Sequence, residues 1–258
     1  MARRQTLFLD KSDILFAGYG AKELLLRQYR GTKIGPIWIV LSQLIVLLSL
    51  TVVFHSIFKR PFADFLPYLS AGLIVWNLVS GCVVQSTSTF VSAASVIHAF
   101  PINYAIFPFQ TLVNQLVLFA HGLGMHLIIM VIMGISLSLV PIAILSMILI
   151  SLILYPAMSV LAVVSARFRD VGLAVSSMVT LVFLVTPIVW QRTMLDPEIS
   201  WLVDFNPLVS MIDIVRQPLN GQWPDPITLA LCVGMAVFSV LFGEWFFRRY
   251  SRPLPFWV

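Results

Sequence analysis

The feature that most constrains this chain is a long stretch without any charged side chain. From Phe65 to Ala166 the sequence contains no Lys, Arg, Asp or Glu. Charged residues make up 10% of the chain, against roughly 25% in a soluble domain, and the mean hydropathy is +0.96. A water-soluble fold of this size does not leave so long a segment uncharged, so the sequence predicts an all-α integral membrane protein.

Six apolar runs are long enough to cross a bilayer, since about 20 residues of helix span a hydrocarbon core of about 30 Å. We expect one transmembrane domain over residues 1–258, with a polar N-terminal part (1–36), five spans (37–190), an external segment (191–226) and a sixth span with a tail (227–258). Tyr155-Pro156 is expected to kink or break the fourth span. The predicted spans are Ile37–Phe58, Tyr68–Phe90, Pro108–Met133, Pro141–Ala166, Val171–Trp190 and Ile227–Phe247.

Lys and Arg are distributed unevenly between the two sides of these spans. Six spans place both termini on one side, and that side carries 12 of the 16 Lys and Arg residues. The positive-inside rule then puts both termini in the cytoplasm. The net charge of +5 indicates membrane orientation rather than nucleic-acid binding, because the basic residues flank apolar runs. Cys82 and Cys232 lie within apolar runs and are interpreted as small core residues.

Three segments outside the spans are expected to contain short helices. Residues 12–30 predict an amphipathic helix in the membrane interface, with a plain positive-inside anchor as the alternative. Residues 91–107 keep apolar side chains between prolines, which suits docking to a partner protein or packing as a loop on the same bundle. In the external segment, Asp196-Pro197-Glu198 and Asn206-Pro207 are helix-start signals that predict two short re-entrant helices. The residues expected at this external gate are Trp201, Phe205, Asn206 and Pro207.

Several chemical motifs are absent from the sequence. There is no Gly-x-x-x-x-Gly-Lys-Ser/Thr loop, so we expect this chain to bind no ATP itself. Ion-coupled transporters commonly place Asp, Glu or His in mid-membrane, and here only His121 and His126 qualify. Five residues apart, they face different sides of a helix, so we interpret them as hydrogen-bonding groups between helices. We therefore expect no catalytic, cofactor-binding or metal-binding residues in this chain, and an energy source elsewhere.

Five short motifs follow one another along the predicted spans. In order and spacing they resemble those of type-2 ABC exporter permeases over essentially the whole chain. Within that family the sequence is most similar to permeases that export O-antigen, capsule or teichoic acid. The motifs are Tyr29–Trp38 at the start of the first span, Ser95–Pro101, Arg167–Asp170, Thr186–Ile188 and Asn206–Leu208.

The resemblance implies a channel-forming transport subunit of the bacterial inner membrane that acts as a homodimer. Two copies of a separate ATP-binding cassette subunit would hold ATP and Mg²⁺, and the substrate would be an undecaprenyl-diphosphate-linked glycan. Residues 95–101 look like the coupling segment of the family but lack the basic residues common in relatives. The residues expected to contact the ATP-binding subunit are Ile97, His98, Phe100 and Tyr104.

A path for such a glycan needs neutral hydrogen-bonding groups and aromatic surfaces, with few charges to trap it. The residues expected to line the channel are Gln43, Asn77, Trp76, Ser177 and Thr180. For the Trp residues, an interfacial aromatic belt is the alternative. Basic residues at the cytoplasmic mouth could bind the diphosphate by charge-assisted hydrogen bonds, or serve topology alone. The residues expected at this gate are Arg27, Arg30, Lys33 and Trp38.

Two other classes of function stay open at this point. A membrane-embedded transferase acting on lipid-linked sugars would need acidic or metal-binding groups at a membrane face, where the sequence offers only Asp170. A drug or lipid efflux permease of the same family would share the spans and motifs. A secondary transporter is disfavoured because the spans lack charged residues for ion coupling.

Overall fold

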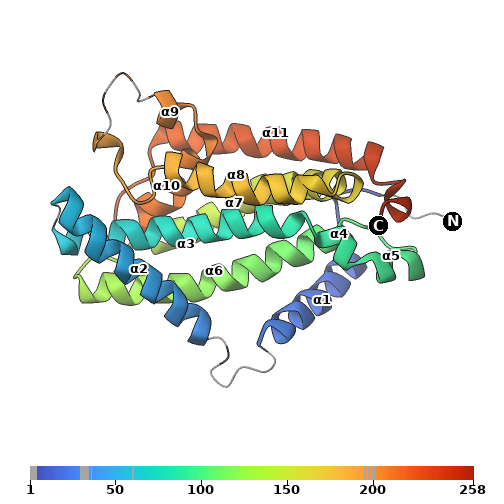
Figure 1. Cartoon of the computed structure of the whole chain (residues 1–258), viewed down its shortest axis with the longest axis horizontal. Coiled ribbons are helices and arrows are strands. Elements are labelled where there is room, and N and C mark those ends of the chain that lie inside the picture. Colours follow the sequence, from blue (N-terminus) through green and yellow to red (C-terminus); the bar gives the residue numbers. More distant parts are fainter. Residues whose placement is uncertain are drawn as a thin grey trace.

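The computed structural model describes residues 5–29, 35, 37–59, 61–194, 196, 198 and 201–258. Long helices run side by side and form an elongated bundle (Figure 1). Both ends of the described chain contact the same segment. Gln5 Nε2 donates to Ile102 O at 3.0 Å, and His98 Nε2 lies 2.9 Å from Pro255 O. We call this end of the bundle the terminal end and the opposite one the distal end.

Five helices are long and apolar enough to cross a membrane. They confirm five of the six predicted spans and a multi-pass membrane protein, with helix ends close to those expected from the apolar runs. Because Glu244 is the only charged residue within these five runs, hydrophobic length sets most of these boundaries. The five helices are α2 (Ile37–Phe58), α3 (Phe62–Ser86), α6 (Ile106–Ile132), α7 (Val140–Arg167) and α11 (Pro226–Tyr250).

The fifth predicted span differs from the expectation. Instead of Val171–Trp190, the helix α8 comprises Asp170–Val185, which is 16 residues and about 24 Å of helix. It ends because Pro187 disfavours helical backbone at Thr186, which is extended with φ −83° and ψ 132°. The following Ile188 and Val189 are buried. A span of full length at this position is therefore not confirmed.

Pro156 does not break α7, contrary to one of the two expected outcomes. The helix continues on both sides of the proline. A carbonyl in the preceding turn, that of Ile153, accepts a hydrogen bond of 2.7 Å from Ser239 Oγ on α11. Such a bond from a neighbouring helix is how a proline is tolerated within a membrane helix. The two helices approach closely because Gly243 has no side chain; a Cβ there would lie 2.5 Å from Pro156 Cβ.

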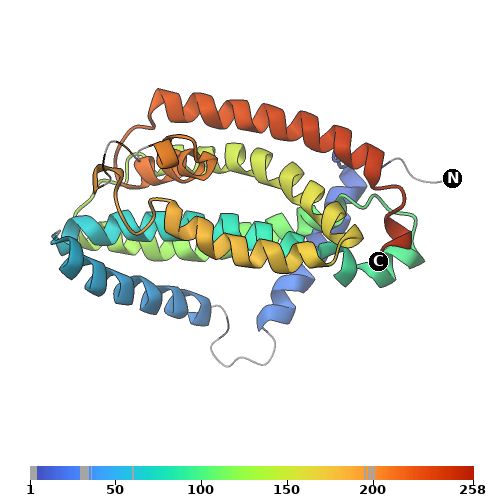
Figure 2. The same cartoon turned by 45° about the horizontal axis from the view of Figure 1, so that its top comes forward.

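Shorter helices lie at both ends of the bundle. At the terminal end lie α1 (Lys11–Tyr29), α4 (Thr89–Ser92), α5 (Ala94–Ala99) and the 3-10 helix η3 (Leu254–Phe256). At the distal end lie η1 (Arg192–Met194), α9 (Trp201–Asp204) and α10 (Pro207–Leu219). Figure 2 shows α10 tucked among the long helices, and its buried face packs on α3, α7 and α11.

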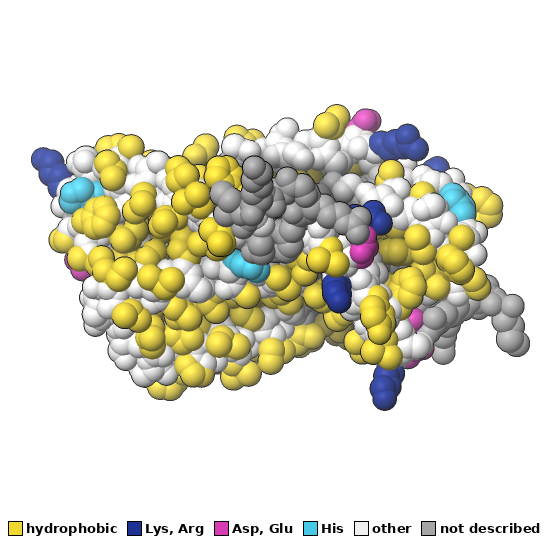
Figure 3. Space-filling model, turned by 90° about the horizontal axis from the view of Figure 1, so that it is seen from below, with side chains coloured by type: hydrophobic (Ala, Val, Ile, Leu, Met, Phe, Trp, Pro, Cys, Tyr) yellow, Lys and Arg dark blue, Asp and Glu magenta, His cyan; other side chains and the backbone are white. Residues whose placement is uncertain are grey.

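The buried side chains form two apolar clusters. The larger one lies between the long helices, and the smaller one lies at the terminal end, around Leu7, Phe90, Ile97 and Phe247. Outside these clusters many apolar side chains are exposed. Figure 3 shows hydrophobic side chains over most of the middle of one face, with charged groups concentrated toward the terminal end. This distribution suits a lipid surround in the middle and water at the ends.

Candidate functional site

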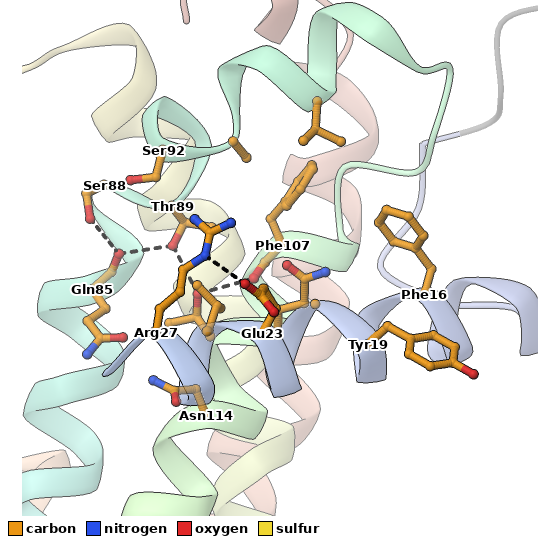
Figure 4. A pocket seen from close by; sticks show the side chains of 16 residues that line it. Phe16, Tyr19, Glu23, Arg27, Gln85, Ser88, Thr89, Ser92, Phe107 and Asn114 are labelled. Atoms are coloured by element: carbon orange, nitrogen blue, oxygen red, sulfur yellow. Dashed lines mark hydrogen bonds and ion pairs between the residues drawn. The ribbon is translucent and has the colours of Figure 1, made fainter. Parts of the chain in front are cut away.

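A cavity of about 490 Å³ opens at the terminal end between α1, α3, α4 and α6. Figure 4 shows its hydroxyl and amide side chains facing α1. Gly20 lets α1 lie directly against α6, since a Cβ there would be 2.0 Å from Gln110 Nε2. We call this the terminal cavity. Its polar lining comprises Gln85, Ser88, Thr89, Ser92, Gln110, Thr111 and Asn114.

Of the two expected gate residues that the structure describes, Arg27 lines this cavity and Trp38 does not. Arg27 Nε donates to Glu23 Oε1 at 3.3 Å; the Arg27 side chain is largely exposed and that of Glu23 is part-buried. The pair lies one helical turn apart, which is the usual spacing for such contacts. Trp38, at the start of α2, is more than half exposed. Arg30 and Lys33 lie outside the residues that the structure describes.

Two of the expected channel residues, Gln43 and Asn77, lie together. Both line a cavity of about 180 Å³ and a neighbouring one of about 190 Å³ between α2, α3 and α6. The other three do not join them. Trp76 is buried, with its ring 5.5 Å from that of Phe183 on α8, so within this chain it is a core residue and not a lining residue. Ser177 and Thr180 lie exposed on α8.

Of the four residues expected to contact an ATP-binding subunit, two are exposed, one is part-buried and one is buried. Ile97 is buried in the smaller apolar cluster, so its side chain packs inside this chain and is not presented to a partner. His98 and Phe100 are exposed. Tyr104 is part-buried, and burial raises the pKa of its phenol above the ordinary value.

An N-terminal strap, residues 5–9, was not anticipated from the sequence. Thr6 Oγ1 and Leu7 N donate to the carboxylate of Glu244 on α11, at 2.6 and 2.7 Å. Asn103 Nδ2 donates to Thr6 O at 2.8 Å, which joins the strap to the loop after α5. Glu244 also pairs with Arg248, as expected from their spacing of four residues. The only sequence feature that pointed to the strap was the carboxylate of Glu244 within a largely apolar helix.

One residue of the expected external gate, Asn206, joins two helices. Asn206 caps α10 as predicted, because its Oδ1 accepts from Leu208 N at 3.0 Å. Its Nδ2 donates to Thr186 Oγ1 at 3.0 Å, which ties the start of α10 to the end of α8. Pro207 is the first residue of α10. Trp201 and Phe205 are exposed.

A buried arginine at the distal end was also missed by sequence reasoning, which treated it only as an external charge. Arg216 forms an ion pair with Asp213 one turn earlier and donates from Nη1 to Pro187 O at 2.7 Å. Its guanidinium lies 4.3 Å from the centre of the Tyr68 ring. Tyr68 Oη in turn donates to Pro187 O and Trp190 O. These contacts fix the turn after α8 against α3 and α10.

The two histidines of α6 behave differently from each other. His126 confirms the expectation of contacts between helices, since its ring nitrogens lie 2.7 Å from Ser70 Oγ on α3 and 3.3 Å from Leu219 O on α10. His121 instead bonds within its own helix, to Val117 O. Among the described residues, no group of three or more His, Cys, Asp or Glu side chains could hold a metal ion.

Comparison with known proteins gives a consistent match. The family model described as ABC-2 type transporter covers residues 20–220 of this chain. The chain is similar to two O-antigen export system permease proteins RfbA from Klebsiella pneumoniae. One is 22% identical over 193 residues, 74% of each chain, and the other is 21% identical over 234 residues, 85% of this chain and 89% of the relative. A third RfbA, from Myxococcus xanthus, is 24% identical over 191 residues, 72% of each chain.

Proposed function

Because this chain belongs to the ABC-2 type transporter family, we propose that it is the channel-forming permease of an ATP-driven exporter for a lipid-linked polysaccharide. The observation that carries the proposal is the similarity to O-antigen export permeases along most of both chains. It agrees with membrane helices that carry amides and hydroxyls but no charges between Phe65 and Ala166. Neutral hydrogen-bonding groups suit a hydroxyl-rich substrate.

In this proposal the energy comes from another protein. Two ATP-binding cassette subunits bind ATP and Mg²⁺ and dock at the terminal end, where His98 and Phe100 are exposed. The permease itself forms a homodimer. Support for a second copy comes from α8, which buries none of its residues in the single chain, and from α2, which is mostly exposed.

The proposed orientation places the terminal end in the cytoplasm of a bacterial cell and the distal end outside the inner membrane. Arg27, together with Arg30 and Lys33, then attracts the diphosphate of the undecaprenyl carrier from the cytoplasmic leaflet. At the distal end, Trp201 and Phe205 are exposed, as side chains at an exit that contacts sugars would be.

Deleting the gene in its own host tests this function. We expect loss of one polysaccharide from the cell surface and accumulation of its lipid-linked form inside, with both defects reversed by the wild-type gene. Mutating the ATP-binding subunit should give the same phenotype, whereas mutating an unrelated exporter should not. Unchanged surface polysaccharide in the deletion strain would contradict the proposal.

A further inference from the structure

The three cavities described above form a single row along α3. The terminal cavity and the 180 Å³ cavity share Gln85 as a lining residue. The 180 Å³ and 190 Å³ cavities share Gln43, Ile74 and Asn77. We call this row of three neighbouring cavities the amide groove. It extends from α1 at the terminal end to Ser70 in the distal half of α3.

The groove is polar but uncharged beyond its mouth. Its inner part is lined by side-chain amides, including Gln43, Asn77 and Gln115. The helices that supply these amides carry no Lys, Arg, Asp or Glu there. Arg27 and Glu23 stand only at the mouth. A charged ligand finds no counter-charge inside, whereas a neutral hydroxylated one finds donors and acceptors at the amides, among apolar side chains.

Two acceptor atoms in the groove lack a protein partner. Among the described residues, Asn114 Oδ1 and Gln43 Oε1 are buried and accept no hydrogen bond. Asn114 is only 6% exposed and lines the terminal cavity. A buried amide oxygen without a partner is costly. Because the Asn114 oxygen lies on the wall of a cavity, a hydrogen-bond donor of a bound ligand can satisfy it.

The glycines of the groove show how the sequence builds it. A Cβ at Gly81 would lie 2.4 Å from Gln115 Oε1, and a Cβ at Gly122 would lie 3.0 Å from Gln43 Oε1. The absence of these side chains lets amides from one helix lie over the backbone of another. Figure 1 shows α2 crossing α3 and α6 obliquely.

We propose that the amide groove binds the sugar residues next to the lipid carrier, within one permease subunit. The inference rests on the proposed function and adds a substrate site to it. Sugar hydroxyls donate to the free oxygens of Asn114 and Gln43, and the exposed ring of Tyr19 at the mouth offers an apolar surface to a pyranose face. The diphosphate stays at the mouth beside Arg27, and the polyprenyl chain lies in the bilayer.

Binding of defined lipids to the full-length permease, in nanodiscs with its ATP-binding subunit, tests the groove. The probes are undecaprenyl diphosphate carrying N-acetylglucosamine, the same lipid carrying galactose, and undecaprenyl diphosphate without sugar. We expect the wild type to bind at least one sugar-bearing lipid roughly fivefold more tightly than the bare lipid. Asn114→Leu and Gln85→Leu should each abolish most of this preference without weakening binding of the bare lipid.

The variants Gln85→Leu and Ser146→Ala separate a loss of binding from misfolding. Gln85 is exposed, so its substitution disturbs no packed core even if Asn114→Leu does. As a matched control, Ser146→Ala removes a membrane hydroxyl that bonds only to its own helix, at Ile142 O, and should leave the preference unchanged. If the wild type prefers the sugar-bearing lipid but both groove variants keep that preference, the groove is wrong and the export function stands. If the wild type shows no preference for either sugar, the groove proposal fails, and the gene deletion alone decides the function.

Discussion

At the scale of single residues, Arg216 illustrates how a charge can be held inside a membrane protein. It lies in the segment 191–226 that was expected to be external, yet its side chain is only 8% exposed. The carboxylate of Asp213, the carbonyl of Pro187 and the ring of Tyr68 together surround the guanidinium. Burying an arginine is costly unless its donors are satisfied, so these three partners explain why the charge is tolerated.

We predict that Arg216→Met destabilises the protein by about 3 kcal/mol, because it leaves Asp213 without its partner in a poorly hydrated site. Thermal unfolding of the detergent-solubilised chain measures the effect. The double variant with Asp213→Leu should recover most of the loss, since no unpaired charge remains. Arg249→Met, at an exposed position of α11, should change stability by less than about 0.5 kcal/mol. Equal stability of Arg216→Met and wild type would contradict the role given to this arginine.

At the scale of elements, the sequence was informative where hydrophobic length decides the structure. Five spans were predicted near their observed positions because an apolar run of membrane length has few alternatives. The helix cap at Asn206 was also predictable, since it depends on two adjacent residues. The burial of Trp76 and of Ile97, and the position of the strap, were not predictable. Each depends on contacts between residues far apart in the chain.

The strap gives a prediction about local stability. Glu244→Ala removes the acceptor for Thr6 and Leu7, and a hydrogen bond to a charged group is worth about 2 kcal/mol. We expect amide hydrogen exchange in residues 5–9 and 100–105 to become roughly thirtyfold faster by local opening. Arg248→Ala removes the ion pair but keeps the strap bonds, so it should leave this exchange almost unchanged. Equal acceleration by both variants would show that the ion pair, and not the strap, holds this region.

At the scale of the whole molecule, the chain is a multi-pass membrane protein of the ABC-2 type transporter family. Long apolar helices form the bundle, polar cavities lie between α2, α3 and α6, and the sequence has no phosphate-binding loop for ATP. Both described ends of the chain meet at the terminal end, where exposed side chains of α5 and the following loop are available to a second protein. The account therefore places the driving force in a separate ATP-binding subunit.

Reconstitution into vesicles tests this central claim most directly. Vesicles would contain the permease alone, or the permease with its ATP-binding subunit, and glycan-bearing undecaprenyl diphosphate whose sugars are reached by a glycosidase on one side only. The account predicts that the glycan crosses the bilayer only when the ATP-binding subunit and hydrolysable ATP are both present. Transfer of the glycan by the permease alone, at the rate seen with the complete system, would contradict it.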